Sequence, residues 1–286
     1  QHLSIMKAKN QIFAAAFFLA ALGLLSSCNE EALPSSSMDE STETAQEVDL
    51  TATMEDIDEV TLTGFQRNGF SDRTLVTLEE DLCQKVIITW LPGEKKMVID
   101  FGDGCTSPRG VVRKGKIIVT YTGRYWVKGT VITTRFEDFY VDGRKIEGIR
   151  VVTNEGFNEN DKFFTFKTVV EGGKITWPDG TFRTFEARHS KKVFLPNGDR
   201  GMYYAITGGS KGINRNGNAY EVKITSPLVY LVRCIQSGIR VPSKGTMTVT
   251  VENRGTIEID FGAEACDREV SITRNGETKT ITVPRS

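Results

Sequence analysis

The stretch Ile99-Asp100-Phe101-Gly102-Asp103-Gly104-Cys105 has a close relative near the C-terminus, Ile259-Asp260-Phe261-Gly262-Ala263-Glu264-Ala265-Cys266. An Arg-x-Gly follows both copies, and its glycine lies ten residues after the cysteine each time. A repeat of this kind indicates how the fold is built, and by itself it does not indicate an activity. It predicts an internal duplication, with repeat motifs near residues 83–122 and 234–284.

Runs with a period of two and many β-branched residues surround both copies, as in residues 115–123 and 246–251. Turn pairs such as Asp142-Gly143 and Asn275-Gly276 separate these runs and supply the positive φ angles that tight hairpins need. The spacing of the turns predicts about 14 to 16 antiparallel strands. We therefore expect residues 67–286 to be all-β, an extended antiparallel meander that forms a twisted sheet or a shallow sandwich. A sheet closed on itself is the alternative.

One short N-terminal helix is expected ahead of the strands. Within residues 47–66, Leu50, Met54 and Ile57 recur at helical spacing with Asp and Glu between them. This pattern predicts an amphipathic helix that docks on the edge or the face of the β-rich domain.

The N-terminal residues have the pattern of a lipoprotein signal peptide, which we assign to residues 1–27. Lys7 and Lys9 precede an apolar run of fourteen residues, Ile12 to Leu25, which is too short for a spanning helix of about 20 residues. The run ends in Leu25-Ser26-Ser27-Cys28, which resembles the lipobox of bacterial lipoproteins. It predicts that Cys28 is the lipidated first residue of the mature protein and tethers it to a membrane.

Residues 28–46 are expected to form an acidic disordered tether, because they are rich in Ser, Thr and Glu and poor in aromatic residues. Asn29-Glu30-Glu31, directly after the cysteine, looks like the acidic sorting signal of some Bacteroidetes-type lipoproteins. It predicts an outer-membrane location with the protein facing the cell exterior.

Charge is distributed unevenly along the chain. No Lys or Arg lies between Lys9 and Arg67, whereas residues 30–59 carry eleven Asp and Glu. From residue 60 onward the chain has 34 Lys and Arg and 26 Asp and Glu. This part therefore carries a net charge of about +8, although the whole chain has a net charge of -1. Because no basic block is longer than two residues, we expect scattered charge and no nucleic-acid partner.

Four cysteines remain after Cys28: Cys83, Cys105, Cys234 and Cys266. An even number in an exported chain predicts disulfides, for which three pairings are possible. A hairpin centred near residue 93 places Cys83 close to Cys105, and the corresponding hairpin near residue 253 places Cys266 near the segment that holds Cys234. The geometry of the hairpins therefore favours Cys83–Cys105 and Cys234–Cys266.

No catalytic residue, cofactor or metal site is predicted. Asp100 with Asp103, and Asp260 with Glu264, could place carboxylates around a Ca²⁺, but aspartates that hydrogen-bond local backbone at the strand ends are the favoured interpretation. Asp100-Phe101-Gly102 spells the kinase magnesium-binding tripeptide, but the other kinase motifs are missing. His189 is the one histidine after Cys28, and no Gly-x-Ser-x-Gly elbow accompanies it, so neither a Ser-His-Asp triad nor a zinc site is predicted. Paired carboxylates of a glycosidase are a tertiary property, which leaves enzymatic activity open.

Tyr125, Trp126 and Trp177 are the candidate ligand-binding residues. Tyr125 and Trp126 lie between two expected strands, and Trp177 precedes the turn Pro178-Asp179-Gly180. Exposed aromatic rings at turns can stack on sugar rings, while the alternative role for them is packing in the core.

Beyond the lipobox, the acidic tether and the repeated Ile-Asp-Phe-Gly, the chain contains Phe136-Glu137-Asp138-Phe139-Tyr140-Val141 and Thr176-Trp177-Pro178-Asp179-Gly180. With these features residues 28–286 resemble a family of uncharacterised Bacteroidetes-type exported lipoproteins. The resemblance implies an exported β-rich protein and no known activity. We expect a lipid-anchored, non-enzymatic surface scaffold or binding module of the cell envelope, whose partner is a glycan or another envelope protein. A glycan-binding or glycan-active lipoprotein is the alternative.

Overall fold

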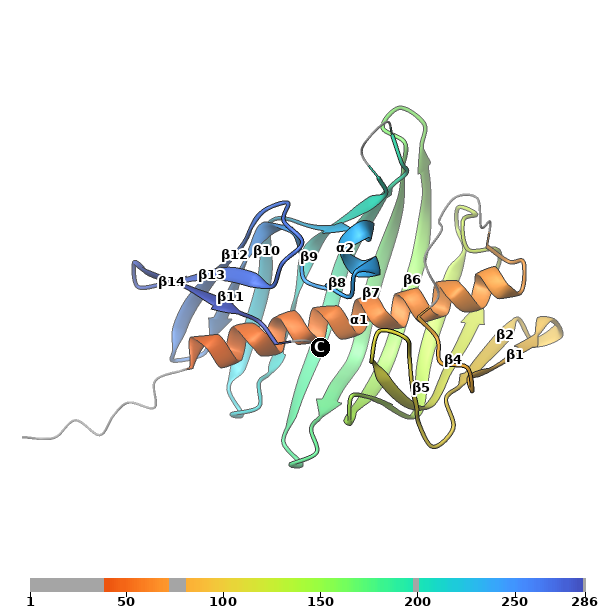
Figure 1. Cartoon of the computed structure of the whole chain (residues 1–286), viewed down its shortest axis with the longest axis horizontal. Helices are drawn as coiled ribbons and strands as arrows, with labels where there is room; N and C mark the ends of the chain where they lie inside the picture. Colours follow the sequence, from red (N-terminus) through yellow and green to blue (C-terminus); the bar gives the residue numbers. More distant parts are fainter. Residues whose placement is uncertain (1–38, 72–80, 198–200, 285–286) are drawn as a thin grey trace, which may run out of the picture. The chain divides into compact units, whose positions relative to one another are not determined.

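The strands follow one another across one antiparallel sheet of 14 strands, in a computed structural model that describes residues 39–71, 81–197 and 201–284 (Figure 1). Sheet order equals chain order from β1 to β14, except that the short β3 pairs with β4 beside β2. β1 and β14 form the two edges, so the sheet is open. The predicted all-β meander is confirmed, as a single sheet and not a sandwich.

The strands are β1 (Ile87–Leu91), β2 (Lys96–Asp100), β3 (Cys105–Thr106), β4 (Val112–Tyr121), β5 (Val131–Val141), β6 (Arg144–Asn158), β7 (Phe163–Thr176), β8 (Phe182–Phe194), β9 (Tyr203–Ile213), β10 (Ala219–Leu231), β11 (Lys244–Val251), β12 (Gly255–Ala263), β13 (Glu269–Arg274) and β14 (Glu277–Thr282). Two helices accompany them, α1 (Glu40–Arg67) and α2 (Val232–Gln236), with a 3-10 turn at Pro92–Glu94.

Tight turns join several pairs of consecutive strands, as the turn chemistry predicts. Asp142 and Gly143, between β5 and β6, have φ angles of 48° and 79°. Asn275 and Gly276, between β13 and β14, have φ angles of 51° and 84°. Two successive positive φ angles match the right-handed twist of the flanking strands, which is why Asn-Gly and Asp-Gly mark hairpins.

The two Ile-Asp-Phe-Gly copies occupy equivalent places. Asp100 ends β2 and Asp260 lies in β12, and each accepts a hydrogen bond at 2.8 Å from the backbone N–H two residues on, at Gly102 and Gly262. Both aspartates therefore close a local turn.

The Arg-x-Gly that follows each copy is not structurally equivalent. Lys116 in β4 faces Asp100, whereas Ser271 in β13 faces Asp260. Gly115 consequently lies inside β4, at a register shift against β5, while Gly276 lies in the β13–β14 turn. Equal spacing in the sequence does not preserve the ladder position, because the segment after each cysteine differs in length and path.

Each repeated hairpin is joined to a neighbouring segment by a disulfide. Cys83 bonds to Cys105, and Cys234 in α2 bonds to Cys266, which confirms the predicted pairing. The Cα atoms are 6.0 and 5.2 Å apart, within the range that a disulfide spans.

Helix α1 begins at Glu40, seven residues before the expected start, and runs for 28 residues to Arg67. Asp39 caps its N-terminus by accepting a hydrogen bond from the Ser41 N–H at 3.1 Å. The last residues of the predicted tether are thus helical, and its part at 28–38 lies outside the described residues. Among the described residues, no helix is both long and apolar enough to cross a membrane.

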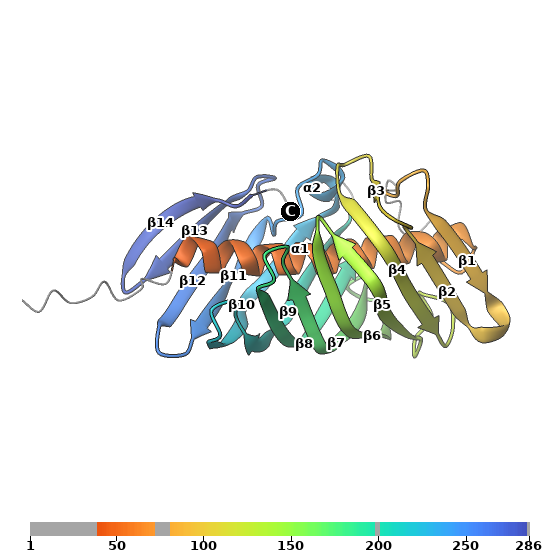
Figure 2. The same cartoon turned by 90° about the horizontal axis from the view of Figure 1, so that it is seen from below.

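α1 crosses the strands on one face of the sheet, which we call the inner face (Figures 1 and 2). It is not amphipathic in the predicted sense, because five carboxylates are buried together with its apolar residues. These are Glu43, Glu47, Glu55, Asp56 and Glu59. Four of them point at basic side chains of the strands or their connections, and Glu43 accepts a hydrogen bond from Asn214.

All eight carboxylates of α1 have a polar partner on the strands or their connections. The pairs are Glu40 with Arg274 and Lys279, Glu43 with Asn214, Glu47 with Arg183, Asp49 with Arg144, Glu55 with Lys191, Asp56 with Arg113 and Arg240, Asp58 with Arg150 and Lys191, and Glu59 with Arg109 and Arg240. A buried charge is tolerated only when it is paired in this way.

Apolar contacts complete the core between α1 and the sheet. Ile57 and Phe65 of α1 are fully buried in one cluster with Met97, Ile99 and other inner-face residues of the strands. Gly64 allows α1 to approach β2 closely, because a Cβ there would lie 2.5 Å from the Met97 sulfur.

Replacing Asp56 by Asn tests how strongly this interface depends on its charges. Arg113 and Arg240, which are 1% and 6% exposed, would lose a shared carboxylate. Because the remaining charges are buried, we expect Asp56→Asn to lower the free energy of unfolding by about 3 to 5 kcal/mol, measured by urea titration.

The control is Glu94→Gln, which removes an exposed partner of Lys96 and should cost at most about 1 kcal/mol. Equal losses in the two variants would contradict a charge-dependent core.

Candidate functional site

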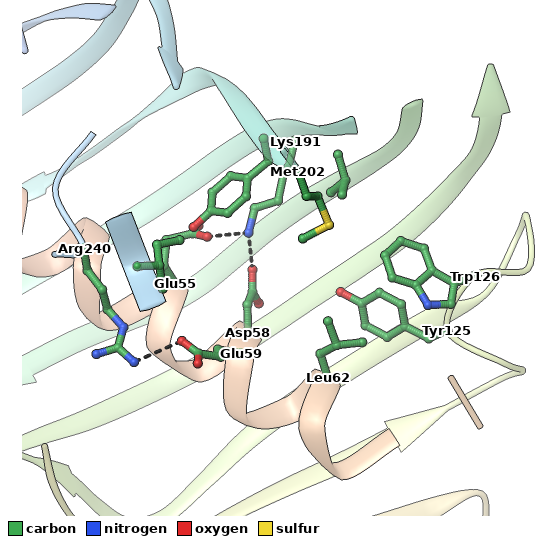
Figure 3. A pocket seen from close by; sticks show the side chains of 12 residues that line it. Glu55, Asp58, Glu59, Leu62, Tyr125, Trp126, Lys191, Met202 and Arg240 are labelled. Atoms are coloured by element: carbon green, nitrogen blue, oxygen red, sulfur yellow. Dashed lines mark hydrogen bonds and ion pairs between the residues drawn. The ribbon is translucent and has the colours of Figure 1, made fainter. Parts of the chain in front are cut away.

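A cavity of about 60 Å³ opens between α1 and the inner face of the sheet (Figure 3). Three aromatic residues, apolar side chains and two ion-paired cations meet there. Its lining consists of Glu55, Asp58, Glu59, Leu62, Tyr125, Trp126, Lys191, Val193, Met202, Tyr204, Ile235 and Arg240.

Local structure explains why these residues meet. Glu55, Asp58, Glu59 and Leu62 are three, four and seven residues apart and therefore share one side of α1. Lys191 and Val193 are two residues apart in β8, so both side chains lie on the inner face of the sheet. Tyr125 and Trp126 come from the connection between β4 and β5, and Tyr204 comes from β9.

Lys191 is the cation at the centre of the cavity wall. Its Nζ donates hydrogen bonds to Glu55 Oε2 at 2.6 Å and to Asp58 Oδ2 at 2.7 Å (Figure 3). Arg150 of β6 pairs with both oxygens of Asp58, with Nη1 2.7 Å from Oδ1 and Nη2 2.8 Å from Oδ2. One helical carboxylate thus joins two strands.

Arg240 lies at the other end of the cavity and joins three acidic residues. Its Nη2 is 3.0 Å from Glu59 Oε2, 3.2 Å from Asp56 Oδ1 and 3.2 Å from Asp81 Oδ2. The guanidinium, which is 6% exposed, fixes the segment after α2 against α1.

The titration behaviour of these groups favours permanent charges. Burial disfavours the charged form of Asp58, but Arg150 and Lys191 hold its pKa below the ordinary value. Burial likewise opposes the charge of Lys191, but Asp58 and Glu55 raise its pKa. General acid-base catalysis works best with a pKa near the operating pH, and neither of these groups provides one.

Tyr125 and Trp126 line this cavity and are also packed against the core. Trp126 donates a hydrogen bond from Nε1 to Ser71 Oγ at 2.7 Å, and its ring lies 4.8 Å from that of Phe164. Burial raises the pKa of Tyr125, whose ring is 4.9 Å from Trp126. Both residues are half-buried, so their rings are held in place with part of their surface open.

Trp177 lies in a separate hollow of about 300 Å³, beside the N-terminal half of α1. The Arg215 guanidinium stacks 4.3 Å from the indole centroid and pairs with Asp179 at 2.7 Å. Gln46 and Asp49 of α1 also line this hollow. The structure therefore distributes the three predicted aromatic residues over two sites.

Sequence reasoning did not identify the ionisable residues of the first cavity: Glu55, Asp58, Glu59, Lys191 and Arg240. The signal available was the segregation of charge, an acidic N-terminal segment without cations followed by a basic body. That segregation indicates that the two parts attract each other, but it does not assign the partners.

His189 lines a second cavity of about 40 Å³ between α1 and the strands. Burial, together with the positive charges of Arg150 and Lys191, lowers its pKa to about 4. The imidazole is consequently neutral at neutral pH.

Within residues 39–71, 81–197 and 201–284, no group of three or more His, Cys, Asp and Glu side chains is arranged to hold a metal ion. No protein-family model, curated protein or solved structure matches this chain. The resemblance to an exported lipoprotein family therefore stays a prediction.

The half-buried His189 makes stability depend on pH in a defined window. The folded-state pKa of about 4 lies below the ordinary value of 6.5, so below pH 6.5 the unfolded chain binds a proton that the folded chain does not. Stability is full above pH 6.5 and falls toward pH 4, by up to about 3 kcal/mol.

Urea titrations between pH 4 and 7 should show this decline in the unmodified chain and a flatter profile in His189→Gln. Parallel profiles would assign the pH dependence to other groups. Below about pH 4 both proteins should weaken further, since Asp58 and Asp81 have lowered pKa values and lose their charge as the pH falls through them.

Proposed function

We propose that this chain is a lipid-anchored protein of the cell envelope that acts as a non-enzymatic surface scaffold or binding module. The observation that carries the binding role is the cavity beside α1, where Tyr125 and Trp126 meet Lys191 and Arg240. Aromatic and apolar walls with a few fixed polar groups are the usual composition of a ligand site, and a volume of about 60 Å³ admits one small group of a ligand and not a whole sugar ring.

The charged groups of the cavity favour binding over chemistry. Lys191 contacts two carboxylates and Arg240 contacts three, so both cations of the cavity wall are ion-paired within the protein. A fixed pattern of paired charges orients a ligand without transferring a proton to it.

The anchor is proposed from the sequence alone. Leu25-Ser26-Ser27-Cys28 lies outside the described residues, as does Asn29-Glu30-Glu31, which suggests the outer membrane and an outward-facing protein. In the sequence, α1 begins twelve residues after Cys28.

Labelling with radioactive palmitate tests the anchor. The unmodified chain should incorporate label in a bacterial host with the lipoprotein pathway and enter the detergent phase on Triton X-114 separation. Cys28→Ser should lose both properties, because one thiol carries the lipid. Retained label in Cys28→Ser would refute the lipobox assignment.

The hollow at Trp177 favours glycan binding as a second candidate function. An indole, a guanidinium, an amide and a carboxylate line it, from Trp177, Arg215, Gln46 and Asp49. Aromatic faces beside polar side chains suit a sugar ring, which has apolar faces and a hydroxylated rim.

A glycan microarray separates the two candidate sites. If glycan is the ligand at the hollow, Trp177→Ala should lose at least about tenfold in affinity, a loss of roughly 1.4 kcal/mol, while Trp126→Ala retains binding. The reverse result would place a small group of the glycan in the cavity beside α1. The absence of any bound glycan on the array with the unmodified chain would refute the glycan candidate.

A further inference from the structure

Strand β1 (Ile87–Leu91) forms one edge of the sheet. It pairs with β2 over its whole length, and within the described residues no strand pairs with its other side. An edge strand of this kind presents backbone N–H and C=O groups that can accept a further strand.

The second copy of the repeat has a neighbouring strand at the position where β1, in the first copy, has none among the described residues. Ile87 faces Asp100 in the first copy just as Thr246 faces Asp260 in the second, so β1 corresponds to β11. The far side of β11 is covered by the antiparallel β10. The first copy presents the same strand position without that neighbour.

The chemistry of β1 also differs from that of the opposite edge. β1 reads Ile-Ile-Thr-Trp-Leu, with no charged residue, whereas β14 carries Glu277 and Lys279. Ile87 is 64% exposed, more than any other large apolar side chain of the described residues. Charged residues protect sheet edges from association, and β1 has none of its own.

We propose that β1 pairs antiparallel with β1 of a second copy of this chain, which joins the two sheets into one. A pairing centred on Thr89 places Ile87 opposite Leu91 of the second copy and Ile88 opposite Trp90. A two-fold axis perpendicular to the sheet relates the copies and makes the interface isologous.

The faces of the strand are compatible with this pairing. Ile88 and Trp90 face β2 residues Ile99 and Met97, which are buried beneath α1, so both lie on the inner face. Ile87 and Thr89 lie on the opposite face and are exposed. The proposed axis places the inner faces of the two sheets on the same side. The paired β1 strands bring no like charges together, because β1 contains no charged residue.

Light scattering of the full chain in detergent, over a wide range of protein concentration, tests the proposal. We expect the mass of two chains for the unmodified protein at high concentration. Thr89→Lys should shift it to the mass of one chain, because the lysine lies on the two-fold axis and opposes its own copy. Since Thr89 is exposed, this variant should fold as the unmodified chain does.

Thr280→Lys is the matched control, an exposed threonine on the opposite edge strand β14, and it should leave the two-chain mass unchanged. Thr89→Cys should form an intermolecular disulfide on oxidation, since directly opposed Cα atoms of antiparallel strands lie about 4.5 to 5.5 Å apart, within reach of a disulfide. Thr280→Cys should form none.

Three results would overturn the proposal. One is a one-chain mass at every concentration. Slow amide exchange over Ile87–Leu91 in such a single chain would show that another part of the same chain covers this edge. Another is a two-chain mass that Thr89→Lys leaves intact. The third is a two-chain mass that Thr280→Lys disrupts, which would assign association to the β14 edge.

Discussion

The attraction between the carboxylates of α1 and the cations of the inner sheet face holds the structure together. Burying charge is unfavourable unless each charge finds a partner, and here seven of the eight carboxylates of the helix pair with a cation, while Glu43 accepts a hydrogen bond from Asn214. The partners come from strands as distant in the sheet as β4 and β14. One helix therefore sets the position of strands that do not contact one another.

Most of the fold could be predicted from local signals. Period-two runs and Gly-containing turns identify a meander, because neighbours in such a sheet are also neighbours in the chain. Hairpin geometry selected the disulfide pairs for the same reason. The path of α1 could not be predicted, since Glu40 and Arg274 are 234 residues apart and only tertiary structure brings them together.

The candidate site was only partly predictable. Tyr125 and Trp126 stand out because aromatic residues in a strand connection are conspicuous, whereas Lys191 and Asp58 look like ordinary surface residues in the sequence. For the duplicated Arg-x-Gly, the sequence indicates an equivalence that the structure does not have. Its spacing is regular, yet Arg113 and Arg274 occupy different ladder positions, and both nevertheless pair with α1.

The contact of Glu40 with Arg274 and Lys279 has a consequence for the order of folding. α1 is synthesised before all the strands, and its cationic partners follow one by one until β14 is made. Contacts so distant in sequence form slowly, because the intervening chain must first be ordered. Until the end of β13 is made, Glu40 has neither of its cationic partners, so the first turn of α1 is the last part of the helix to be paired.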